Sequence, residues 1–280
     1  MLASGWNDEE VDGRTIAVSG DGFSGPVHVR EDGPADAPPL VLLHGFGGSL
    51  HWYDDVVALL ADTFRVIRVD LLGHGGTGGR AADAPRQAQM VEAVLANLEV
   101  TGATAVGHSF GADVAVELAE RSARVERLVI VTQAPDYSDA VLPRGRALMT
   151  VPLLGPALHG FARLIAGPLS RLVRPRRALV EQAVRDLRAL DSGMFRIVLV
   201  KRRDRMARRP LDTQLREAGK PALVILGGHD HFYGDRSAPR YRAAGARVEV
   251  IPDSGHSPCI EFPERTAELI RDFAAAPVAS

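Results

Sequence analysis

Gly107-His108-Ser109-Phe110-Gly111 follows the apolar run at residues 103–106 and precedes a helical pattern that starts at Ala112. A serine with a glycine two residues before it and another two residues after it, between a strand and a helix, is typical of a nucleophile elbow. The tight turn projects the Ser109 hydroxyl above the sheet edge, and the glycines let neighbouring backbone approach without a Cβ clash. The alternative is a serine that only caps the helix. The strand–turn–helix context favours the nucleophile.

A serine nucleophile needs a general base, and the base needs a carboxylate that orients it. His256 lies in the loop at residues 252–258, after the last predicted strand, and Asp230 follows the strand before it. Open α/β sheets place their sites just past the carboxyl ends of strands. We therefore expect Ser109, Asp230 and His256 to form a catalytic triad. Asp136 follows the sixth predicted strand and is the alternative acid, although the short Gly227-Gly228 turn favours Asp230.

A glycine-dense turn, His44-Gly45-Phe46-Gly47-Gly48, follows the third predicted strand. Such a turn exposes backbone N–H groups, which can stabilise the oxyanion of an acyl-transfer intermediate. We expect the amides of Phe46 and Phe110 to be the two donors. His44 is interpreted as a structural histidine that holds this loop.

Short apolar runs bounded by turn residues alternate with helical patterns, which predicts parallel strands covered by helices on both faces. An antiparallel hairpin is expected at the sheet edge before residue 39. Strands are predicted at residues 15–19, 26–30, 39–44, 65–70, 103–108, 125–132, 221–227 and 246–251, and helices at 52–61, 87–98, 112–121 and 263–274.

Residues 136–216 interrupt this alternation with helical periodicity and no convincing strand. They contain 17 Lys and Arg against 7 Asp and Glu, although the whole chain has 33 against 35. This asymmetry indicates an inserted helical unit with its own surface requirements. We expect a core domain formed by residues 1–135 and 217–280, and a cap, or lid, formed by residues 136–216.

The composition excludes several classes of protein. A net charge of −2 does not indicate a protein that binds nucleic acid through an overall basic surface. The single cysteine, Cys259, cannot form an internal disulfide or a cluster of thiolate metal ligands. The first residues lack the basic and apolar regions of a signal peptide, and no apolar stretch reaches the ~18 residues of a membrane span. The expectation is a cytoplasmic protein without a membrane-inserted segment, of undefined oligomeric state.

Five motifs occur in the order found in the α/β-hydrolase family, and the chain resembles its capped, esterase-like members. They are His44–Gly48, the turn Asp70-Leu71-Leu72-Gly73-His74-Gly75, the elbow, the turn at residues 227–230, and Gly255-His256. The resemblance spans about residues 25–275, with 136–216 matching only in its place as a cap. It implies an eight-stranded, mostly parallel sheet, an acyl-enzyme mechanism and no cofactor. Family members that cleave halides or epoxides carry an aspartate where this chain has Ser109, which argues against both activities.

The resulting hypothesis is a serine hydrolase that cleaves a carboxylic ester of a small or medium apolar substrate. Because the triad does not fix the scissile bond, a C–C hydrolase and a thioesterase are alternatives. A non-hydrolytic lyase or ligand-binding protein is a third. The residues expected to line the substrate pocket are Gly45, His108, Trp52, Leu153, Phe161 and Tyr233.

The cap contains a basic cluster at Arg171, Arg174, Arg176 and Arg177. Such clusters are usually solvated surface, but they can also attract an anionic substrate or a membrane surface. The expected partner is a small molecule, with no nucleic acid and no metal, and surface attraction through the basic cap is the alternative use of this charge.

Overall fold

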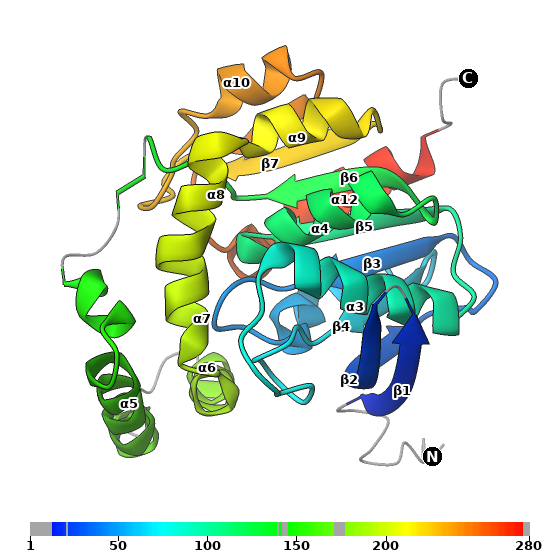
Figure 1. The fold of residues 1–280 in the computed structure, drawn as a ribbon. Helices are drawn as coiled ribbons and strands as arrows, with labels where there is room; N and C mark the ends of the chain where they lie inside the picture. The colour runs from blue at the N-terminus through cyan, green and yellow to red at the C-terminus, as the bar shows by residue number, and fades with distance from the viewer. Residues whose placement is uncertain (1–12, 21, 139, 142–144, 171–176, 277–280) are drawn as a thin grey trace.

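Eight strands form a single sheet in the order β1-β2-β4-β3-β5-β6-β7-β8 (Figure 1). The computed structural model describes residues 13–20, 22–138, 140–141, 145–170 and 177–276. The β1–β2 and β2–β4 pairs are antiparallel, and every later pair is parallel, so the predicted edge hairpin and parallel sheet are confirmed. The strands are β1 (Arg14–Gly20), β2 (Phe23–Asp32), β3 (Pro39–Leu43), β4 (Arg65–Val69), β5 (Ala103–His108), β6 (Val125–Val131), β7 (Ala222–Gly227) and β8 (Arg247–Ile251).

Both faces of this sheet are buried. Along β3, Val41 and Leu43 belong to one hydrophobic core, whereas Leu40 and Leu42 belong to the other. This alternation explains why the strand is a continuous apolar run, as expected of a parallel sheet covered on both sides. The core helices are η1 (Leu50–Tyr53), α2 (Asp54–Val57), α3 (Ala84–Asn97), α4 (Phe110–Arg121), α9 (Leu211–Ala218), α10 (Ala238–Ala243), α11 (Pro258–Glu261) and α12 (Pro263–Ala275).

Between β6 and α9, the described helices stand beyond the ends of β6 and β7 toward which the arrows of these strands point (Figure 1). These helices are η2 (Arg146–Thr150), α5 (Leu154–Ser170), α6 (Arg177–Ala189), α7 (Gly193–Arg196), the π-helical turn η3 (Ile197–Lys201) and α8 (Arg202–Arg208). The expected boundary at residue 216 falls inside α9, which packs against α4 in the core layer. Within the described residues, no helix has the length and apolarity needed to cross a membrane.

Candidate active site

Ser109 occupies a strained turn between β5 and α4. Its φ of 50° lies in the left-handed region, which non-glycine residues seldom adopt. A Cβ at Gly107 would lie 2.2 Å from the Gly111 carbonyl oxygen, and a Cβ at Gly111 would lie 2.1 Å from the carbonyl oxygen of Leu43. Since both contacts are with backbone, only glycine fits at these positions. The two glycines therefore allow the turn that projects the serine.

The structure brings Ser109, His256 and Asp230 into one hydrogen-bonded chain. Nε2 of His256 lies 3.1 Å from the Ser109 hydroxyl, and Nδ1 lies 2.8 Å from Oδ2 of Asp230. Because a carboxylate only accepts, the proton of the neutral ring is on Nδ1, and the lone pair of Nε2 faces the hydroxyl. Asp230 is buried, and its Oδ1 accepts the backbone N–H of Phe232 at 2.8 Å. This arrangement can remove a proton from Ser109 and stabilise the imidazolium that results.

The backbone of His256 is held by His108, which was expected only as a pocket residue, and by Thr132, which the sequence did not single out. The carbonyl oxygen of His256 accepts Nε2–H of His108 at 2.7 Å and the hydroxyl of Thr132 at 2.8 Å. Burial lowers the pKa of His108 to about 3, aided by the neighbouring His256, so this donor is a neutral ring. Thr132 directly follows β6 and has a φ of 45°, another strained position at the sheet edge. The available signal was a polar residue at the carboxyl end of the strand predicted over residues 125–132.

Glu261 supports the same loop from the other side. Its carboxylate accepts the backbone N–H of Gly255 at 2.6 Å and that of Ser257 at 2.8 Å, on either side of His256. The sequence does not identify Glu261 in advance, because its partners are backbone N–H groups, which every residue except proline carries. Any acidic side chain within reach could accept the same hydrogen bonds. The histidine is therefore held by its ring, its carbonyl and both neighbouring amides.

The loop after β3 lies beside the elbow. A Cβ on Gly45 would lie 3.2 Å from Cβ of Ser109, so the loop backbone passes close to this serine. The N–H groups of Phe46 and Phe110 take part in none of the backbone hydrogen bonds that close the surrounding turns. His44 is buried, accepts the Leu71 N–H at 3.0 Å and donates to the Gly45 carbonyl at 2.8 Å, which supports its structural role.

A buried carboxylate, Asp70, joins the start of η1 to the turn at Gly76 and to His28 of β2. It accepts the N–H of Leu50 and the N–H of Gly76, both at 2.7 Å, and Nδ1 of His28 lies 2.8 Å away. Burial alone would raise the pKa of Asp70, but these hydrogen bonds and the nearby His44 together lower it. The ionised carboxylate thus organises the loops that surround the serine.

Asp136, the alternative acid, is engaged elsewhere. Its carboxylate accepts the N–H of Ser138 and Nη1 of Arg240, both at 2.8 Å. These partners, together with burial that works in the opposite direction, leave its pKa lowered. Of the two carboxylates, Asp230 is the one that contacts His256.

Four of the six residues expected to line the pocket lie beside Ser109, His256 or His108. The ring of Trp52 stacks on His108 at 6.2 Å, and the rings of His108 and Tyr233 lie 5.2 and 5.8 Å from that of His256. Gly45 is the fourth. Phe232, which was not expected to line the pocket, contacts His256 edge-on at 4.9 Å.

Leu153 and Phe161 differ from the expectation. Their side chains are 87% and 61% exposed in the cap and take no part in the ring contacts around His256. Apolar composition predicts a roof over the site, but Phe161 of α5 and Leu153, which directly precedes α5, both point to solvent. Of the predicted basic cluster, Arg171, Arg174 and Arg176 lie outside the described residues, as does the side chain of Arg177.

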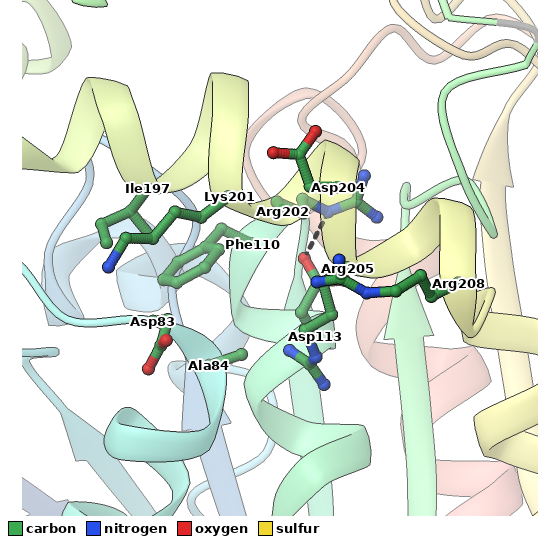
Figure 2. A pocket seen from close by; sticks show the side chains of 10 residues that line it. All are labelled: Asp83, Ala84, Phe110, Asp113, Ile197, Lys201, Arg202, Asp204, Arg205 and Arg208. Atoms are coloured by element: carbon green, nitrogen blue, oxygen red, sulfur yellow. Dashed lines mark hydrogen bonds and ion pairs between the residues drawn. The ribbon is translucent and has the colours of Figure 1, made fainter.

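Helix α8 contacts α4, the helix that follows Ser109, through a buried ion pair, shown in Figure 2. Nε of Arg202, at the start of α8, donates to Asp113 of α4 at 2.7 Å, and both side chains are almost fully buried. Burial opposes the charge on Arg202, but Asp113 outweighs it and leaves the pKa of the guanidinium raised. A cavity of about 270 Å³ beside this pair is also lined by Phe110. The cap is thus joined to the helix that begins at the elbow.

Known proteins are similar to this chain over most of its length. Residues 40–269 match the Alpha/beta hydrolase family. An uncharacterized protein of Mycobacterium tuberculosis is 30% identical over 261 residues, covering 84% of this chain and 75% of that protein. The pimeloyl-(acyl-carrier protein) methyl ester esterase of Nitrosomonas europaea is 29% identical, covering 85% of this chain and 96% of that one. Among solved structures, the enol-lactonase from Burkholderia xenovorans LB400 has a TM-score of 0.72 at 25% identity, covering 94% of this chain and 100% of that chain.

Proposed function

Because the chain belongs to the alpha/beta hydrolase family, we propose that it is a serine hydrolase that cleaves carboxylic esters through an acyl-enzyme. The single observation that carries this proposal is the hydrogen-bonded chain from Ser109 through His256 to Asp230. A serine hydroxyl beside an oriented imidazole is an activated nucleophile. Relatives whose names describe ester or lactone chemistry support the same class of bond.

In the proposed first half-reaction, the Ser109 oxygen attacks the ester carbonyl while His256 Nε2 takes its proton. The carbonyl oxygen becomes an oxyanion, which the N–H groups of Phe46 and Phe110 would stabilise. Ser109 precedes the first turn of α4, so the positive end of the helix dipole adds to this stabilisation. His256 then gives its proton to the leaving alcohol, and the acyl group remains on Ser109.

In the second half-reaction, His256 activates water, which attacks the acyl-enzyme and releases the acid. Asp230 stays ionised throughout and keeps the proton of the resting ring on Nδ1. The rings of Phe232 and Tyr233 beside His256, and that of Trp52 beside His108, favour a small or medium apolar acyl or alcohol group.

The test is a series of p-nitrophenyl esters of increasing acyl length, with Ser109→Ala as the variant. We expect saturable hydrolysis with a preferred chain length, and a loss of at least about 10⁴-fold in kcat for the variant. Circular dichroism should show that the variant remains folded. A folded wild type that hydrolyses every ester of the series no faster than buffer alone would contradict ester hydrolysis. Activity only on thioesters or on C–C substrates would identify an alternative named above.

A further inference from the structure

The described residues expose eight large apolar side chains, and all eight lie between Val141 and Leu164 of the cap. Solvent-exposed apolar residues are normally scattered, and a contiguous patch indicates an interaction surface. The most exposed are Leu153 at 87%, Leu164 at 72% and Phe161 at 61%. We call the following set the apolar face: Leu148, Val151, Leu153, Leu154, Leu158, Phe161 and Leu164.

Helix α5 is apolar on two sides, and only one of them is covered. On the covered side, His159 is buried, its Nε2 donates to the carbonyl of Leu190, and its ring contacts Phe195. On the other side, Leu154, Leu158 and Phe161 follow one another at i, i+4 and i+7, so they form one exposed stripe. A helix that is apolar all round is normally buried. In this protein α5 lies at the outer end of the cap, far from the sheet (Figure 1).

The backbone at the start of α5 holds one member of this face outward. Leu153 has a φ of 66°, a left-handed conformation that is strained for a residue with a bulky side chain. The strain is not compensated by burial, since this is the most exposed large apolar residue of the set. A strained residue that displays a leucine to solvent indicates a use for that leucine outside the folded chain.

The charge of the described residues on this part of the chain favours one kind of surface. Arg146 of η2 and Arg163 of α5 are both exposed, and the sequence from residue 140 to residue 180 contains no aspartate or glutamate. Two copies of this face would bring like charges together, which disfavours a symmetric dimer. Anionic lipid headgroups would neutralise the arginines, while the acyl region would take up the apolar side chains.

We propose that the apolar face binds the surface of an anionic lipid bilayer, with α5 lying along the interface and its stripe inserted at headgroup depth. The attachment is peripheral and reversible, since it uses one face of one helix and the turn before it. It does not depend on the proposed hydrolase activity, and it is tested by binding alone.

The test is sedimentation of the protein with sucrose-loaded vesicles of phosphatidylcholine, alone or mixed with phosphatidylglycerol. We expect the wild type to bind the mixed vesicles and to be released by high salt, which screens the headgroup charge. Phe161→Ser should weaken binding by about tenfold, since it removes one inserted aromatic side chain. The matched control Phe161→Leu should retain most of the binding, because the face stays apolar. Arg163→Gln should reduce the preference for anionic vesicles.

Each variant is checked by circular dichroism and thermal unfolding, and light scattering gives the oligomeric state over a range of concentrations. Equal binding of Phe161→Ser and the wild type would overturn the proposal, as would a wild type that binds neither kind of vesicle. A concentration-dependent dimer that Phe161→Ser dissociates, without vesicle binding, would assign the face to a second copy of the chain.

Discussion

Replacing Asp230 by asparagine should block proton transfer while leaving the fold intact, and the reason follows from the two oxygens of the carboxylate. Oδ1 accepts the backbone N–H of Phe232, and Oδ2 accepts Nδ1–H of His256. In the variant, the amide oxygen must remain at Phe232, because an NH₂ group there would face another donor. The NH₂ group then faces His256, so Nδ1 becomes the acceptor and the proton moves to Nε2. A protonated Nε2 cannot take the proton of Ser109.

The expected magnitude is a loss of about 10⁴-fold in kcat, or about 5 kcal/mol of transition-state stabilisation, as for a triad histidine held in the wrong tautomer. The assay is steady-state hydrolysis of a short p-nitrophenyl ester at neutral pH, with urea unfolding as the measure of stability. Asp136→Asn is the matched control, since Asp136 binds Arg240 and Ser138 at the surface, and its rate should stay within about threefold of wild type. An Asp230→Asn enzyme within tenfold of wild type, or an equal loss in Asp136→Asn, would refute the assignment.

Three further predictions concern the scaffold of the site. Gly111→Ala should destabilise the protein by more than about 4 kcal/mol or prevent folding, because the new Cβ would lie 2.1 Å from a carbonyl oxygen. Gly160→Ala is the control: its Cβ would meet nothing within 4 Å, so it should be neutral or stabilise the protein by up to about 1 kcal/mol. Comparable urea midpoints for the two variants would contradict this prediction. Arg202→Met should lower the free energy of unfolding in urea by about 3–5 kcal/mol, because the buried charge of Asp113 loses its ion-pair partner. The double variant that adds Asp113→Asn should recover part of this loss. An Arg202→Met variant as stable as wild type would contradict a stabilising role of the pair. Burial lowers the pKa of both His74 and His108 to about 3. Below pH 6.5, these two rings are therefore protonated in the unfolded chain but stay neutral in the folded chain. The free energy of unfolding should fall with decreasing pH by up to about 1.4 kcal/mol per pH unit for each ring. His74→Gln should flatten this pH dependence and the exposed His231→Gln should not; equal slopes for the two variants would contradict the argument.

The sequence predicted the features that local chemistry determines. The central strands β3, β5 and β7 were recognisable because a strand buried on both faces is a short apolar run. The elbow was recognisable because Gly107 and Gly111 must lack a Cβ where the backbone approaches. The order of Ser109, Asp230 and His256 followed from the positions of strand ends, which a parallel sheet gathers at one edge.

Features that depend on tertiary placement were missed or misjudged. Thr132 and Glu261 hold the backbone around His256, and side chains that bind backbone leave no spacing to recognise. Leu153 and Phe161 were expected over the pocket because apolar residues are usually buried, yet the orientation of α5 decides which side is covered. The expected boundary at residue 216 falls inside α9, which packs against α4, because composition alone does not show which layer a helix joins.

The measurement that tests the central claim most directly is labelling of the intact protein with a fluorophosphonate, followed by peptide mass spectrometry. If the imidazole of His256 activates the hydroxyl of Ser109, the wild type should take up one phosphonyl group, on Ser109, and His256→Ala should take up almost none in the same time. Folded wild-type protein that stays unlabelled, or that is modified at another residue while Ser109 remains free, would contradict the account.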